Sequence, residues 1–177
     1  MRSPVDLILE DEEWLTDLPD LAEVAATGAR MALELFDIAP GNVEIAVLAC
    51  GDQKIKALNG SFRDKPHATN VLSWPALDLS ARRSGEVPDP PPDIAAGTVL
   101  SLGDVAIARQ TCVQEAESGG IPLKTHVTHL ILHSVLHLLG YDHQTEQDAE
   151  LMEGLESRAM LAAGLPNPYR VPRDGPA

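Results

Sequence analysis

The sequence contains only two cysteines, Cys50 and Cys112, which lie far apart and show no C-x-x-C spacing. Small secreted domains depend on several disulfides, and cysteine zinc sites need closely spaced pairs of thiols. The sequence therefore indicates neither a disulfide framework nor a cysteine zinc site. A reduced, cytoplasmic setting fits this cysteine content best.

Long apolar runs are also missing. The N-terminal segment carries Arg2 but soon enters an acidic stretch that includes Glu10, Asp11, Glu12 and Glu13. A signal peptide needs a continuous apolar stretch, and a membrane-spanning helix needs about 20 apolar residues. We therefore expect a soluble, unprocessed protein with no membrane partner.

Basic residues are scarce, because 13 lysines and arginines face 27 acidic residues and leave a formal net charge of -14. Such a surface repels a polyanion over most of its area and favours solubility. Non-specific binding to nucleic acid is therefore disfavoured. Affinity for nucleic acid depends on where a few cations lie rather than on their total, so a protein that acts on nucleic acid is not excluded.

No internal repeat divides the 177 residues, which suffice for one domain with a sizeable core. We expect a single domain over residues 1–165. Within it, four prolines between residues 88 and 92 mark 76–101 as a proline-rich surface loop. The proline-rich end, residues 166–177, is predicted to be a loose tail.

Apolar periodicity predicts an α/β fold in which helices cover a sheet. Short apolar runs typical of strands occur at residues 5–9, 43–48, 71–74 and 102–107. Helical periodicity predicts helices at 14–36, with a start after Pro19 as an alternative, and at 52–58, 108–117, 122–140 and 145–164. Asn59 and Gly60 are expected to break the helix that begins at Asp52. The strand, helix, strand order implies a crossover between parallel strands.

Histidines are concentrated in one stretch, because five of the six lie between residues 125 and 143. On a helix, His129, His133 and His137 fall on one face. Imidazoles four residues apart can share a metal ion. His129 and His137 are about 12 Å apart along such a helix, too far to share an ion whose bonds to nitrogen are about 2.0 to 2.1 Å. A third ligand must therefore come from beyond a bend.

Gly140 supplies that bend, because glycine readily takes the left-handed conformation that ends helices. We therefore predict one Zn²⁺ ion per chain, bound by His133, His137 and His143. The resulting spacing, H-x-x-x-H-x-x-G-x-x-H, is that of metzincin proteases, but Ser134 stands where their catalytic glutamate would be. The spacing thus indicates a metal site and argues against peptidase chemistry. The roles of His126 and His129 stay open between supporting the ligands and packing.

Two longer motifs and one short one resemble a known family. They are HLILHSVLHLLGYDH at residues 129–143, LNGSFRDKPHATNVLSWP at 58–75 and Leu102-Gly103-Asp104. With these motifs the chain resembles the YbeY family, bacterial endoribonucleases specific for single-stranded RNA. It departs from the family pattern at Ser134, where glycine is usual, and at Trp74, where phenylalanine is usual.

The resemblance implies both a fold and a site. The fold would be a single α/β (α+β) domain with a mixed four-stranded sheet, packed helices and a zinc-binding helix followed by a turn. Zinc would lie on His133, His137 and His143, and the catalytic residues would be Arg63 and His133. The substrate would be single-stranded RNA and not DNA, cut in 16S rRNA 3′-end maturation and ribosome quality control. The small ribosomal subunit and ribosome-assembly factors would be the partners.

The proposed ligands also suit a catalytic mechanism. Three neutral imidazoles leave the fourth zinc position open, as in catalytic rather than structural sites. Water bound there ionises near neutral pH, and Arg63 can neutralise negative charge developing on a phosphate. Two alternatives remain: a zinc metallopeptidase, and a non-enzymatic ribosome-associated module whose zinc is structural.

Overall fold

Four strands pair into one sheet in the computed structural model, which describes residues 2–63 and 67–169 and, of residues 62 and 63, the backbone alone. The strands are β1 (Val5–Leu9), β2 (Val43–Cys50), β3 (Val71–Pro75) and β4 (Leu100–Ala108), in the spatial order β1-β2-β4-β3. The first two pairs in this order are parallel, and β3 lies antiparallel to β4 at one edge. The predicted mixed four-stranded sheet is confirmed.

The helices follow the predicted periodicity closely. They are α1 (Trp14–Asp17), α2 (Leu21–Glu34), α3 (Asp52–Arg63), α4 (Arg109–Gly119), α5 (Leu123–Leu138) and α6 (Glu146–Ala162), with a short 3-10 helix η1 (Pro40–Asn42). The alternative start after Pro19 is correct, because α2 begins at Leu21 and α1 is a separate turn. None of the helices within the described ranges is both long and apolar enough to cross a membrane.

The break predicted at Asn59 and Gly60 is wrong, because α3 continues through both residues to Arg63. The Asn59 side chain is buried, and its amide donates to the carbonyl oxygen of His67 at 3.0 Å. This contact with the chain beyond the helix satisfies the amide, so Asn59 does not compete for the helix backbone.

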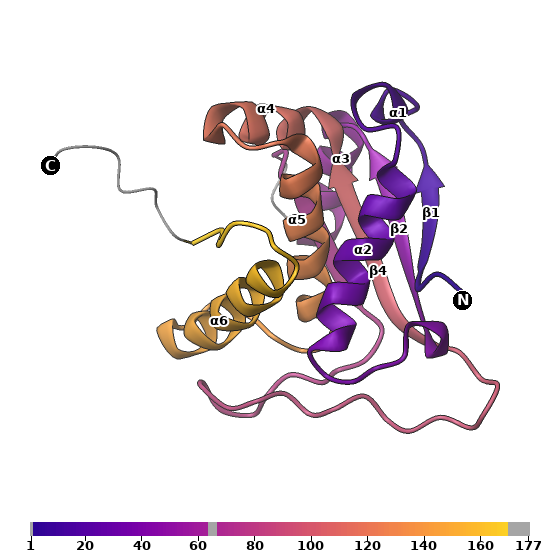
Figure 1. Cartoon of the computed structure of the whole chain (residues 1–177), viewed down its shortest axis with the longest axis vertical. Helices are drawn as coiled ribbons and strands as arrows, with labels where there is room; N and C mark the ends of the chain where they lie inside the picture. The colour runs from indigo at the N-terminus through magenta and orange to yellow at the C-terminus, as the bar shows by residue number, and fades with distance from the viewer. Residues whose placement is uncertain (1, 64–66, 170–177) are drawn as a thin grey trace, which may run out of the picture.

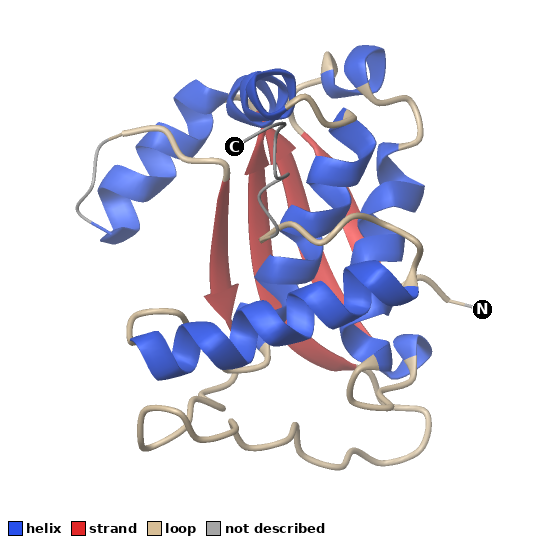
Figure 2. Cartoon of the chain, turned by 60° about the vertical axis from the view of Figure 1, so that its left-hand side comes forward, coloured by secondary structure: helices blue, strands red, loops and turns tan. Residues whose placement is uncertain are grey.

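The helices form layers on the two faces of the sheet. In β2 the buried residues at alternate positions, among them Ile45 and Val47, join the main core with α2 and α5, whereas Cys50 joins a smaller cluster with Ile55 of α3. Figures 1 and 2 show α2 and α5 side by side on one face. They approach closely at Gly28, where a Cβ atom would lie 2.7 Å from the carbonyl oxygen of Thr128.

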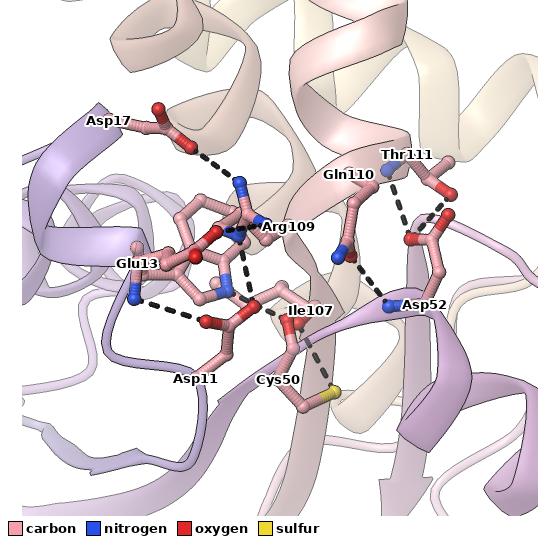
Figure 3. A network of polar contacts seen from close by, with 10 residues as sticks. Asp11, Glu13, Asp17, Cys50, Asp52, Ile107, Arg109, Gln110 and Thr111 are labelled. Carbon is pink, nitrogen blue, oxygen red and sulfur yellow. Dashed lines mark hydrogen bonds and ion pairs between the residues drawn. The ribbon is translucent and has the colours of Figure 1, made fainter.

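A dense polar network lies where β1, β2 and β4 end, and Figure 3 shows its centre, Arg109. The guanidinium contacts three carboxylates, from Asp11, Glu13 and Asp17, at 2.9, 2.6 and 3.0 Å. Asp52 accepts from both the backbone N–H and the hydroxyl of Thr111. Ligands of open α/β sheets usually bind at the carboxyl ends of parallel strands. Here these groups satisfy one another, and the candidate site lies elsewhere.

Residues 76–99 connect β3 to β4 without helix or strand and run along the lower side of the molecule in Figures 1 and 2. This segment docks on the start of α6. The Ser84 hydroxyl bonds the hydroxyl of Thr145, and the N–H of Gly85 donates to Asp148 at 2.8 Å. Thr145 caps α6 by accepting from the N–H of Asp148 at 3.2 Å. The capping residues of α6 therefore also anchor the long connection.

Candidate metal centre

Helix α5 carries His133 and His137 on its outer face. Apolar residues elsewhere on the helix, among them Ile131 and Val135, are fully buried in the main core. The ring centroids of the two histidines are 4.5 Å apart, and their Nε2 atoms are separated by 3.0 Å. Core packing therefore orients α5 so that these imidazoles meet at the surface.

A glycine turn ends α5 and returns the chain to the histidines. Gly140 has a φ of 99°, as predicted for the bend. Its N–H donates to the carbonyl of His137, and the N–H of Tyr141 donates to that of Leu136, both at 3.0 Å. These two bonds form a Schellman motif. The turn brings the ring of His143 to 5.3 Å from that of His133 and 5.1 Å from that of His137.

The backbone of this turn also holds His137, whose Nδ1 lies 2.9 Å from the carbonyl oxygen of Tyr141. A carbonyl only accepts, so Nδ1 carries the proton of the neutral ring and Nε2 presents a lone pair. Burial, and after it the neighbouring His133, lower the pKa of His137 to about 4. His137 is therefore held in the neutral form that binds metal ions.

A carboxylate from another helix contacts His133. Glu156 of α6 has no exposed surface, and its Oε1 bonds Nδ1 of His133. Its Oε2 accepts from the hydroxyl of Tyr169, and Nε2 of His129 lies 3.5 Å from Oε1. Burial raises the pKa of the Glu156 carboxyl, but the histidine and tyrosine donors outweigh this effect and lower the pKa to about 2. Glu156 is therefore a buried, ionised carboxylate next to His133.

Neither Glu156 nor Tyr169 was predicted from the sequence as a residue of the site. One signal for Glu156 was present, because it lies four residues after Met152 and three before Ala159, on the apolar face predicted for α6. Acidic residues are almost never fully buried unless they are paired. Tyr169 lies in the segment predicted to be a loose tail, and no pattern in the sequence indicated its contact with Glu156.

The three predicted ligands lie together. Ligand nitrogens of His133, His137 and His143 are all within 4.8 Å of one another. In a tetrahedral site with Zn–N bonds of about 2.0 to 2.1 Å, ligand nitrogens are roughly 3.3 Å apart. The pair at 3.0 Å is close to this spacing, and the exposed His143 can approach by a small side-chain movement. This group can therefore hold one metal ion.

An open cleft of about 1120 Å³ leads to these histidines. It extends along β3, the edge strand, and is lined by all three histidines as well as by Asn59 of α3 and Ser80 of the connecting segment. A metal ion held by the three imidazoles would face this cleft with a coordination position to spare. Catalytic zinc sites have such an open position, whereas structural sites are closed by a fourth protein ligand.

Other polar residues of this stretch are not part of the ligand group. Nε2 of His126 is 2.7 Å from a carboxylate oxygen of Glu115. Asp142 accepts from the N–H of His143 at 2.8 Å and so stabilises the turn. Ser134 is fully buried, does not line the cleft and has no hydrogen-bond partner for its hydroxyl in the described part of the chain. The metzincin base position is therefore occupied by a residue that cannot reach a substrate.

Arg63 is the last residue of α3, the helix whose Asn59 lines the cleft. The side chain of Arg63 and the whole of Lys65 lie outside the described residues. The catalytic role expected for Arg63 therefore stays a prediction.

The family model and two curated relatives that match this chain share one name. The family model described as Endoribonuclease YbeY matches residues 9–164. A protein of that name from Ruegeria pomeroyi is 51% identical over 170 residues, which cover 94% of this chain and 98% of the relative. Another from Dinoroseobacter shibae is 45% identical over 174 residues, covering 97% and 93%. The solution structure of TM1509 from Thermotoga maritima is similar over 97% of this chain and 99% of its own, with a TM-score of 0.49 and 17% identity.

Proposed function

This chain belongs to the YbeY endoribonuclease family, and from that premise we propose that it is a zinc-dependent endoribonuclease that cuts single-stranded RNA. Its biological substrate in this proposal is rRNA, cut during 16S rRNA 3′-end maturation and ribosome quality control in the cytoplasm. The partners are the small ribosomal subunit and ribosome-assembly factors. One zinc ion per chain is held by His133, His137 and His143.

One observation carries the metal-dependent part of this proposal. The Nε2 atoms of His133 and His137 face each other at 3.0 Å, while the opposite nitrogen of each ring is bonded by a separate acceptor, Glu156 or the Tyr141 carbonyl. Metal-binding histidines almost always donate their other ring N–H to a carboxylate or a backbone carbonyl. The two rings are thus arranged as a pair of ligands before any ion binds.

A zinc ion held by His133, His137 and His143 would supply Lewis acidity, for polarising a phosphoryl oxygen or activating a water molecule. The residues around it define where the reacting phosphate lies. The cleft is lined by His133, His137 and His143 together with residues of the edge strand β3. A phosphodiester bound at the ligand group would therefore lie in this cleft, and its neighbouring nucleotides would extend along it.

Arg63 is proposed to stabilise the negative charge that develops on the phosphate. Its backbone position at the end of α3 is close in sequence to Asn59, which lines the same cleft. A guanidinium offers a fixed fork of donors that matches two phosphate oxygens, and it stays protonated at all physiological pH values. Arginine cannot itself bind zinc, so its role is separate from that of the three histidines.

The distribution of cations supports a small contact area on RNA. Four arginines and lysines away from the cleft pair with acidic residues among the described residues. The pairs are Arg2–Glu44, Arg30–Glu23 and Lys124–Asp20, and Arg109 with Asp11, Glu13 and Asp17. Arg82 and Arg83 form no ion pair with a described residue and follow Ser80, which lines the cleft. Few free cations cannot hold a rigid duplex along its length, whereas a short flexible strand needs only local contacts.

A cleavage assay tests the proposal. Purified protein with zinc is incubated with single-stranded RNA, the matching duplex and casein, each with and without a chelator. We expect cleavage of the single strand only, abolished by the chelator and restored by zinc. Cleavage of casein would favour the metallopeptidase alternative, and bound zinc without cleavage of any substrate would favour the structural module.

A further inference from the structure

Glu156 is a charged residue in the interior of the protein. Its side chain has no exposed surface and lies on α6 among the buried Met152, Ala159 and Met160. Moving an ionised carboxylate out of water costs several kcal/mol even after the protein relaxes. A hydrophobic residue of similar size would fill the same space without this cost. The position therefore calls for an explanation beyond packing.

Donors from two elements converge on this carboxylate. His133 and His129 approach Oε1 from α5, and the Tyr169 hydroxyl bonds Oε2 from the segment after α6. The Tyr169 ring also packs edge-on against His129, with centroids 5.8 Å apart and an interplanar angle of 87°. The carboxylate is therefore fixed from both sides, and its closest partner on α5 is one of the proposed zinc ligands.

The bond to Glu156 decides which nitrogen of His133 carries a proton. A neutral imidazole has one N–H and one lone pair, and an ionised carboxylate can only accept. Nδ1 of His133 must then hold the proton, which leaves the lone pair on Nε2, the atom that faces His137 at 3.0 Å. With the proton on Nε2 instead, His133 could not bind a metal ion in the cleft.

We propose that Glu156, held in place by Tyr169, is a positioning residue that fixes His133 in its metal-binding tautomer and supplies a buried negative charge beside the cation site. This inference rests on the metal centre of the proposed function and assigns it a residue from a different helix. His137 achieves the same tautomer with a neutral backbone carbonyl. The three imidazole ligands are neutral. Of the two groups that bond their outer nitrogens, the Tyr141 carbonyl and Glu156, only Glu156 adds a negative charge to the site.

The tautomer can be measured in the metal-free wild-type protein. Two-dimensional ¹H–¹⁵N correlation NMR at mildly alkaline pH distinguishes a protonated ring nitrogen from an unprotonated one, and the H133A variant identifies the His133 signals. We expect the proton of His133 on Nδ1. A proton found mainly on Nε2 would overturn the proposal, and this measurement needs no variant of Glu156.

Metal affinity in variants gives the second measurement. E156Q keeps the size of the side chain but removes its charge and offers an amide donor as well as an acceptor. Supporting residues of this kind typically contribute about 10- to 100-fold to metal affinity, so we expect zinc to bind E156Q weaker by about that factor. Y169F should weaken binding in the same direction by less. Binding of Co²⁺ should give an altered visible absorption spectrum in E156Q.

Glu153 provides a matched control, because it lies on the same helix three residues earlier and its charge acts on Tyr169 only through space, whereas the hydrogen bonds to His133 and Tyr169 are made by Glu156. E153Q removes the same charge and should bind zinc as the wild type does. Zinc affinity of a folded E156Q within twofold of wild type would reduce Glu156 to a packing role. If E156Q does not fold, the zinc affinity of Y169F and the His133 tautomer in the wild-type protein test the role of Glu156. Unchanged affinity in Y169F together with a proton on Nε2 of His133 would overturn it.

These outcomes separate this inference from the proposed function. Wild-type protein that binds no divalent ion would remove the zinc centre, whatever the tautomer of His133. Wild-type protein that binds zinc and cleaves RNA, together with an unchanged E156Q, would overturn only the role of Glu156.

Discussion

Gly140 lies directly against Leu79, so that a Cβ atom added to the glycine would come within 2.7 Å of the carbonyl carbon of Leu79. This contact joins the end of the histidine helix to the segment that connects β3 and β4. The same glycine has a φ of 99° and closes the turn that returns His143 to the other two histidines. One residue therefore serves the fold and the metal centre together.

Replacing this glycine should damage both. In G140A we expect a backbone cost of about 1 to 2 kcal/mol from the left-handed conformation, with a further loss from the overlap with Leu79. Zinc should bind more weakly because His143 is displaced. Urea unfolding and zinc titration measure the two effects. G154A is the control: Gly154 lies in α6 with open space around it, and alanine there should stabilise the protein by about 0.5 to 1 kcal/mol.

Each of the three proposed ligands should be needed for tight zinc binding. H133A, H137A and H143A should each lose bound zinc during gel filtration, because two imidazoles hold the ion much less firmly than three. Elemental analysis of the eluted protein gives the zinc content. H126A is the control. His126 lies on the helix that carries His133 and His137, but its ring bonds Glu115, so this variant should keep one zinc ion per chain. Full zinc content in H133A would contradict the assignment.

Arg63 should be needed for catalysis and not for metal binding. R63A should keep its zinc and cut single-stranded RNA more slowly by about 10²- to 10³-fold, comparable with the loss of an oxyanion donor. R63K keeps the charge but loses the planar fork, so it should stay substantially impaired if two phosphate oxygens are bound at once. R30A, which breaks a surface pair with Glu23, should cut RNA normally. A near wild-type rate for R63A argues against a catalytic arginine, and loss of zinc from R63A would make the residue structural.

Arg82 and Arg83 should contribute to RNA binding by neutralising phosphates. Affinity for a fluorescent single-stranded RNA, measured in chelator at several salt concentrations, should decrease in R82A/R83A. The slope of log affinity against log salt should become shallower by about 0.7 for each phosphate that the variant no longer neutralises. R2A/R30A removes the same net charge from two ion-paired positions and should leave the slope close to wild type. Equal salt slopes in R82A/R83A and R2A/R30A would indicate that the RNA does not contact Arg82 and Arg83.

Local patterns in the sequence predicted most of the fold. The positions of the four strands and the buried faces of the helices follow from apolar periodicity, because each element must bury one face. Gly140 was also recognisable as a helix end from the sequence alone, because the left-handed conformation that ends a helix is a local property of glycine. The break expected at Asn59 was wrong because a contact with the carbonyl of His67, eight residues away, satisfies the side chain. No local rule takes account of such a partner.

The sequence by itself determined that His133, His137 and His143 can converge, because a helical turn and a glycine bend are local geometry. The tertiary structure alone decided what supports them. The contact between Glu156 and His133 joins two helices whose residues are 23 positions apart, and Tyr169 reaches the same carboxylate from beyond α6. The packing of α6 beside α5 set these partners, since burial of a whole apolar face fixes which side chains meet across the interface. The same packing made Glu156 a buried charge, which its position in the sequence only hinted at.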